Sequence, residues 1–124
     1  MNNFQISKNF NLQEFECSHP DHRHVKVDDK LVEKLQILRD KLGKPLTINS
    51  AYRCEVRNKQ VGGAKNSQHL YGKAADISLH NINMPIERLE KLAESIGFDG
   101  IGLYNTFIHL DTRGGNSVIM WDNR

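Results

Sequence analysis

The chain has 124 residues, of which 38% are hydrophobic and 26% charged, the size and composition of one globular domain with a modest core. Its formal net charge of +2, without any Lys- or Arg-rich run, disfavours a nucleic-acid-binding face. No stretch approaches the roughly 18 apolar residues of a membrane-spanning helix, and residues 1–8 lack the apolar segment of a secretory signal. We therefore expect neither nucleic acid nor a membrane as a partner.

The first half of the chain predicts a helix, a strand and a long loop. Over residues 29–42 apolar side chains recur along one helical face, and Gly43 ends the pattern. Residues 46–50 alternate in hydrophobicity and predict a short strand. Residues 51–75, rich in Gly, Lys, Asn and Gln, predict mostly loop, which leads into a strand that begins at Asp76.

The second half predicts one helix and a group of strands. Residues 85–96 carry a second apolar stripe, with Pro at the first turn and Gly after the end. Residues 100–104 and 106–111 predict a hairpin, and residues 117–121 a last strand. Because helices and strands mix without a repeating strand–helix–strand rhythm, we expect an α+β fold in which helices flank a small antiparallel sheet. A single domain spanning residues 1–124 is the simplest organisation.

Two histidines and an aspartate carry the chemistry that the sequence suggests. His69 and Asp76 stand seven residues apart, and the small residues between them let the chain turn so that both side chains reach one point. His109 follows 33 residues later within an apolar run, an odd place for a polar ring with nothing to bind. Imidazole and carboxylate ligands suit zinc, and three protein ligands leave a fourth position for water. The alternatives are a chance spacing for the pair and a hydrogen-bonded core histidine for His109.

Beyond these three residues, an ordered set of motifs resembles the zinc D-Ala-D-Ala carboxypeptidase and peptidoglycan endopeptidase family. The motifs are Tyr52-Arg53, then Ser67-x-His69-x-x-Gly72-x-Ala74-x-Asp76, then His109-x-Asp111, and near the N-terminus Phe10-Asn11-Leu12-x-Glu14-Phe15. The resemblance runs from about Phe10 to Arg113, nearly the whole chain. It implies the hedgehog-like and lysostaphin-like zinc peptidase fold, and it is strongest to small phage or prophage members.

The resemblance implies a role for each matched residue. His69, Asp76 and His109 match the zinc ligands, so Zn²⁺ is the implied cofactor. Arg53 matches the arginine that grips the substrate and the developing oxyanion, a task that suits a permanently charged fork of donors. Ser67 matches a residue near the substrate peptide. Without the neighbouring motifs, Arg53 would indicate a surface salt bridge and Ser67 a loop or capping hydroxyl.

The sequence departs from the family at the general base. Many members carry an acidic residue three positions before the second zinc histidine, and Thr106 stands there in this chain. Asp111 shares a predicted strand face with His109 and is the expected catalytic replacement, because a carboxylate near the zinc-bound water can accept its proton. The alternative is that Asp111 accepts a hydrogen bond from the ligand imidazole and orients it.

Three further features favour structural roles. Cys17 and Cys54 are the only cysteines, and without a signal sequence we expect both to remain buried or half-buried thiols. Residues 17–24 hold one Cys and three His, which suggests a second metal site, but a proline interrupts them and we expect a solvated loop. Phe107 and Trp121 are expected in the core rather than at the substrate.

Together these features predict a zinc metallopeptidase that hydrolyses peptidoglycan stem peptides, as a D-Ala-D-Ala carboxypeptidase or a murein endopeptidase. We expect a monomer that is cytoplasmic when synthesised and acts on the cell wall after phage-type release or as part of a virion. A rival is a non-catalytic wall-binding or phage structural protein that keeps the zinc fold, and Thr106 keeps this rival open. A third is a regulatory zinc protein of the hedgehog-like type.

Overall fold

A five-stranded sheet forms the centre of the structure, a computed structural model that describes residues 3–19, 21 and 24–124. Across the sheet the strands are β1 (Ile48–Ser50), β2 (Ala74–Ser78), β4 (Phe107–Asp111), β3 (Gly100–Leu103) and β5 (Ile119–Asp122). Neighbours run antiparallel, except that β5 pairs with β3 in parallel. The predicted α+β class is confirmed, whereas the sheet is mostly rather than wholly antiparallel.

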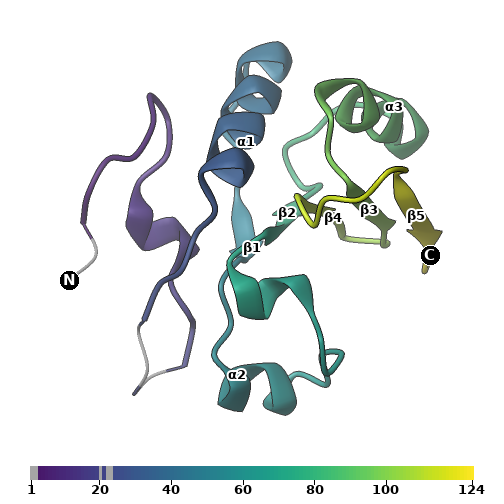
Figure 1. The fold of residues 1–124 in the computed structure, drawn as a ribbon. Coiled ribbons are helices and arrows are strands. Elements are labelled where there is room, and N and C mark those ends of the chain that lie inside the picture. The colour runs from purple at the N-terminus through teal and green to yellow at the C-terminus, as the bar shows by residue number, and fades with distance from the viewer. Residues whose placement is uncertain (1–2, 20, 22–23) are drawn as a thin grey trace.

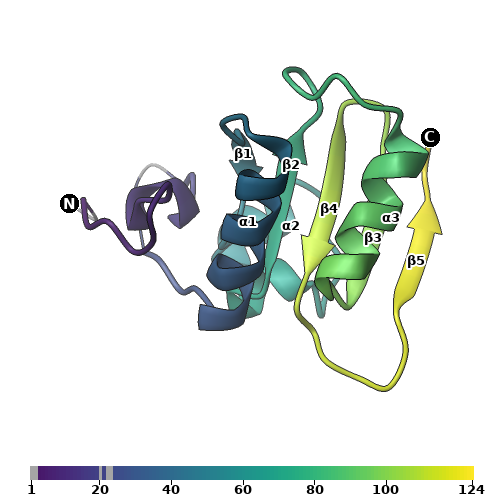
Figure 2. The ribbon, with the colours of Figure 1, turned by 90° about the horizontal axis from the view of Figure 1, so that it is seen from above.

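Two helices cover one face of this sheet and a shorter helix lies on the other side (Figures 1 and 2). The covering pair is α1 (Asp29–Leu42) and α3 (Ile86–Ile96), close to the predicted bounds, and each ends at a glycine in the left-handed conformation. Their apolar stripes are buried against the sheet, as the spacing predicts, and form the core together with strand residues such as Ile77, Ile101 and Ile108. Across the described residues, no helix is long and apolar enough to cross a membrane.

The predicted loop over residues 51–75 is wrong in part, because it contains the α-helix α2 (Glu55–Gln60) and the 3₁₀-helix η2 (Gln68–Tyr71). Helix α2 has no apolar stripe, since its one large hydrophobic side chain, Val56, is 46% exposed. Periodicity therefore could not reveal it. Its stabilising features are local: the Cys54 sulfur accepts the N–H of Arg57 at the N-terminus, and acidic and basic residues flank the helix in the order its dipole favours.

The N-terminal segment lies beside β1 and α1 (Figure 2). It contains the 3₁₀-helix η1 (Leu12–Phe15), which Asn11 and Glu14 close by a reciprocal capping box. Phe10 and Phe15 are both buried, with ring centroids 6.0 Å apart. The carbonyl of Phe15 accepts the N–H of Tyr52 at 3.1 Å, so this segment is fastened directly to the residue before Arg53.

Candidate active site

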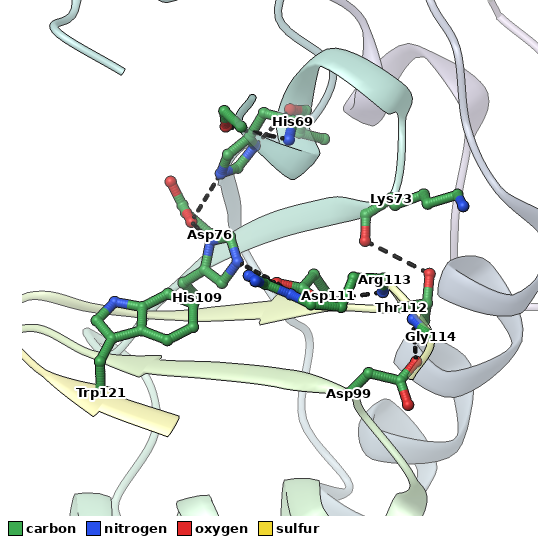
Figure 3. A network of polar contacts seen from close by, with 12 residues as sticks. His69, Lys73, Asp76, Asp99, His109, Asp111, Thr112, Arg113, Gly114 and Trp121 are labelled. Atoms are coloured by element: carbon green, nitrogen blue, oxygen red, sulfur yellow. Dashed lines mark hydrogen bonds and ion pairs between the residues drawn. The ribbon is translucent and has the colours of Figure 1, made fainter. Parts of the chain in front are cut away.

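His69, Asp76 and His109 meet on the face of the sheet opposite α1 and α3 (Figure 3). Asp76 on β2 and His109 on β4 are directly paired across the two strands, and His69 reaches them from η2. The Asp76 Oδ1 atom lies 3.2 Å from His69 Nε2 and 3.1 Å from His109 Nδ1. All three side chains are largely or fully buried, and one ligand atom from each lies within 4.8 Å of the others.

The turn at Gly72 allows His69 and Asp76, seven residues apart in the chain, to reach the same point. Gly72 adopts a left-handed conformation with φ of 69°, where the chain leaves η2 and enters β2. A Cβ atom here would also lie 2.3 Å from the carbonyl oxygen of Lys26, so glycine is required for two reasons. Ser67 Oγ accepts the N–H of His69 at 3.2 Å, which is the capping role that the sequence left open, and Ser67 also lines the cleft.

Each imidazole has a partner on the side facing away from Asp76. His69 Nδ1 lies 2.6 Å from the carbonyl oxygen of Ala51, which can only accept, so this nitrogen carries the hydrogen. His109 Nε2 lies 2.7 Å from Asp111 Oδ2, and an ionised carboxylate also only accepts. In the neutral rings, the unprotonated nitrogens therefore both point at Asp76 Oδ1. Three lone-pair donors converge on one point, an arrangement that a bound cation would stabilise and whose ligand types suit zinc.

Without a metal, the cluster keeps its carboxylates ionised and stabilises a proton on His109. Burial disfavours the ionised form of Asp76, but contacts with His109 and His69 outweigh burial and hold the pKa of this carboxyl at about 2. Burial also lowers the pKa of His109, but Asp111 and Asp76 outweigh it and raise the pKa above the ordinary value. A proton on His109 thus balances the carboxylates unless a metal ion takes that place.

Asp111 is fully buried, and both of its oxygens are occupied (Figure 3). Oδ2 accepts Arg113 Nη2 at 2.7 Å besides the His109 ring, and Oδ1 accepts the Arg113 backbone N–H at 3.1 Å. The bare backbone of Gly100 lies against the carboxylate, since a Cβ there would come within 2.2 Å of Oδ2. Burial alone would raise the pKa of Asp111, but His109 and Arg113 lower it to about 2. This geometry favours orientation of His109 over proton transfer.

The backbone of Arg53 is hydrogen-bonded to His69, the histidine whose ring Ala51 orients. Its N–H donates to the carbonyl of His69 at 3.1 Å, while Ala51, two residues earlier, accepts from the His69 ring. The guanidinium lines the same cleft as the three clustered residues. Burial lowers the pKa of Arg53, and the charge of Asp76 opposes that change, so the side chain stays cationic. Among the described residues, its Nε atom is buried without a hydrogen-bond partner.

Gly63 leaves room for the Arg53 side chain because it lacks a Cβ atom, and a methyl group there is expected to displace the guanidinium. A Cβ atom at Gly63 would lie 2.0 Å from Asn58 Oδ1 and 2.9 Å from Arg53 Nη1. We expect Gly63→Ala to lower kcat/KM roughly tenfold or more by shifting the guanidinium, with a loss of about 1–3 kcal/mol in the free energy of unfolding from the overpacking. Steady-state kinetics and denaturant unfolding measure the two effects.

Gly62→Ala is the matched control for this substitution. Gly62 has φ of 72°, but nothing lies within 4 Å of its Cβ position, so alanine would strain the backbone without touching Arg53. We expect a stability loss of about 1 kcal/mol with kcat/KM nearly unchanged. Equal losses of activity in both variants would contradict a specific support of Arg53 by Gly63.

The cleft around the cluster encloses about 610 Å³ and has an aromatic wall that the sequence did not predict. Phe107 and Trp121, expected in the core, are half-buried and line the cleft instead. The Trp121 ring packs against the His109 ring at a centroid distance of 5.0 Å, and its Nε1 donates to the Tyr104 hydroxyl at 2.9 Å. Trp121 reaches this place because β5 joins the sheet beside β3, a pairing that depends on tertiary structure.

The residues that suggested a second metal site lie only partly within the described chain. His22 is among the residues outside it, so the prediction for 17–24 as a whole concerns residues that the structure leaves undescribed. His19 is buried, and its Nδ1 accepts the N–H of Asp21 at 3.1 Å. Within the described ranges, His69, Asp76 and His109 are the one group of three ligand side chains that could hold a metal.

Curated relatives are similar to parts of this chain. Zinc D-Ala-D-Ala carboxypeptidase of Streptomyces albus G is 51% identical over 45 residues, covering 36% of this chain and 18% of that protein. Peptidoglycan L,D-endopeptidase MepK of Escherichia coli is 34% identical over 95 residues, covering 69% of this chain and 51% of that protein. Probable MepK of Haemophilus influenzae is 34% identical over 97 residues, covering 70% and 51%. The chain thus spans about half the length of the MepK proteins and less of the carboxypeptidase.

A family model described as Peptidase M15 matches residues 8–111. The matched range contains all three clustered residues and the segments that orient them, from the N-terminal helix η1 through the end of β4. Since the match covers most of the chain, the protein belongs to the peptidase M15 family.

Proposed function

We propose that this protein is a metallopeptidase that hydrolyses peptide bonds in peptidoglycan, with zinc held by His69, Asp76 and His109. The observation that carries the proposal is the convergence of two imidazole lone pairs and one carboxylate at a single buried point. The family supports a peptidase, and the relatives named zinc carboxypeptidase and peptidoglycan endopeptidase support the metal and the substrate class.

The protein's own residues would prepare the site for this chemistry. His69, Asp76 and His109 would hold the zinc ion, which would supply Lewis-acid activation of water and of the substrate carbonyl. The carbonyl of Ala51 and the carboxylate of Asp111 fix the two ligand rings, so the metal-binding nitrogens are aimed before any ion arrives. We assign Asp111 to this orienting role in place of the general base, because its oxygens are occupied and its pKa is about 2.

Arg53 is the residue we assign to substrate binding and oxyanion stabilisation. Three arginines line the cleft, but Arg113 is paired with Asp111, and Arg57 Nε donates to Ser18 Oγ at 3.0 Å. Among the described residues, Asp76 acts on Arg53 only through its charge and Arg53 Nε has no hydrogen-bond partner, so the guanidinium is available to a carboxylate or carbonyl of the substrate. Stem peptides carry such carboxylates. Ser67, at the rim of the same cleft, is a second substrate contact in this proposal.

The proposal is tested by digesting purified peptidoglycan with the zinc-loaded protein and identifying the products by mass spectrometry. We expect release of terminal D-Ala for a carboxypeptidase, or shortened or separated stem peptides for an endopeptidase. Chelation and His69→Ala should each abolish the products. Added zinc should restore product formation in the chelated wild type but not in His69→Ala. An unchanged product profile in the presence of zinc, with the protein still bound to the wall, would support the non-catalytic alternative instead.

A further inference from the structure

The thiols of Cys17 and Cys54 touch each other although the residues lie 37 positions apart in the chain. Their sulfur atoms are 3.4 Å apart. Cys17 follows helix η1 and is completely inaccessible to solvent, whereas Cys54 is the N-cap of helix α2 and is half-buried. Both are thiols in the structure, as the sequence predicted, but their contact joins the N-terminal segment to the residue directly after Arg53.

Each of the two sulfurs accepts a backbone N–H, which fixes its position. The N–H of Cys54 donates to Cys17 Sγ at 3.3 Å, and the N–H of Arg57 donates to Cys54 Sγ at 3.4 Å. Two residues before each cysteine, the carbonyl of Phe15 accepts the N–H of Tyr52 and joins the two segments. Within the N-terminal segment, Cys17 donates its own N–H to the carbonyl of His24 at 2.8 Å. Because the Phe15–Tyr52 and Cys54–Cys17 hydrogen bonds join the two segments and the sulfurs already touch, a small movement of the side chains would bring the sulfurs to bonding distance.

We propose that Cys17 and Cys54 form an intramolecular disulfide when the protein meets a disulfide oxidant such as oxidised glutathione. The thiolate of one cysteine attacks a sulfur of the oxidant, forms a mixed disulfide and releases one reduced glutathione. The thiolate of the other cysteine then attacks the protein sulfur of that mixed disulfide and releases the second. Two protons leave the two thiols, and two electrons pass to glutathione, which departs as two thiols.

The burial of the two residues sets the order of these steps. Cys54 is half-buried and can meet a molecule of the size of glutathione, whereas Cys17 is fully enclosed. Cys54 is therefore the residue that reacts with the oxidant, and Cys17 resolves the mixed disulfide. The bond would enclose the chain from residue 17 to residue 54, including α1 and β1, and so would fasten the segment beside Arg53.

This inference goes beyond the proposed peptidase activity, since the thiols lie outside the metal cluster and their reaction does not use it. It does agree with that activity, because peptidoglycan lies outside the cytoplasm, where disulfides persist. We expect the oxidised protein to melt roughly 10 °C above the reduced protein, from the entropy that the closed loop removes from the unfolded chain.

The test is to incubate the folded wild type with oxidised glutathione and to analyse it by intact mass and by peptide mapping without reduction. We expect the loss of two hydrogen atoms and one cross-linked peptide pair containing Cys17 and Cys54. In Cys17→Ala, we expect glutathione to remain attached to Cys54, whereas Cys54→Ala should leave Cys17 unmodified. The two alanine variants should also lose the oxidation-dependent rise in Tm.

Three outcomes would overturn the proposal. The first is a wild type that stays fully reduced under conditions where unfolded protein is oxidised. The second is a disulfide that joins two protein molecules instead of the two residues of one chain. The third is a second tightly bound zinc ion in the reduced wild type that both alanine variants lose, since the sulfurs would then be metal ligands.

Discussion

Asp76→Asn is expected to weaken zinc binding by more than about 1,000-fold and to abolish peptidase activity, without destabilising the metal-free protein at a pH where both histidine rings are neutral. Asparagine keeps the shape of aspartate but removes the negative charge on which both imidazole nitrogens converge. Substitutions of groups that only orient a ligand already cost about 10–100-fold, so the loss of a ligand itself should cost more. Titration calorimetry with zinc and product analysis on peptidoglycan measure the two effects.

The metal-free form of the same variant provides a sharper criterion. Above the pKa of His109, where both rings are neutral, the amide group of an asparagine at this position can donate hydrogen bonds to the unprotonated ring nitrogens of His69 and His109, which Asp76 cannot do. At such a pH we therefore expect the Tm of metal-free Asp76→Asn to equal or exceed that of the metal-free wild type, and below that pKa, where Asp76 pairs with a charged His109, we expect it to be lower. Asp40→Asn, at an exposed position of α1 on the other face of the sheet, is the matched control and should leave zinc affinity unchanged.

A variant that binds zinc as tightly as the wild type would contradict the assignment of Asp76 as a ligand. A large fall in Tm without metal, at a pH where both rings are neutral, would contradict a different point, the convergence of lone pairs. It would mean that the two histidines donate to Asp76 in the metal-free protein and that the cluster is stable as a hydrogen-bonded group.

The parts of the fold that sequence predicts well are those whose signals are local. Helices α1 and α3 carry apolar stripes that end at Gly43 and Gly97, and the structure places both helices within a residue or so of the predicted bounds. The hairpin of β3 and β4 follows from two strand-like runs on either side of Asn105. Each of these signals concerns neighbours in the chain, so it survives without knowledge of tertiary contacts.

The place of β5 depends on tertiary contacts instead, whereas helix α2 has local stabilising features but no apolar stripe that would reveal it. Helix α2 buries only Asn58, whose amide donates to the carbonyl of Ala64 and holds the loop that follows the helix. Strand β5 pairs in parallel with β3 across a long connection, which brings Trp121 over the His109 ring. Nothing in the local sequence of either segment specifies the element against which it packs.

The grouping of His69, Asp76 and His109 could be predicted, but the partner that decides the role of Asp111 could not. The period of a strand places Asp111 on the same face as His109, and the structure agrees. Arg113 lies beyond the end of β4, where the period no longer applies, and its fork turns back onto the carboxylate. The sequence therefore cannot distinguish whether Asp111 is a general base or orients His109, whereas its contacts in the structure can.

Asp111→Asn separates these two roles, because they place the loss in different measured quantities. If Asp111 orients His109, the neutral amide weakens the hold on the ring, so the Kd for zinc should rise about 10–100-fold while kcat at saturating zinc stays within a few-fold of the wild type. If Asp111 were the base, zinc affinity would hardly change and kcat would fall at least about 100-fold. Kinetics over a range of free zinc, with Asp40→Asn as control, distinguish the two outcomes. The pKa of about 2 favours the first, since a carboxylate ionised so readily is a weak acceptor of protons near neutral pH.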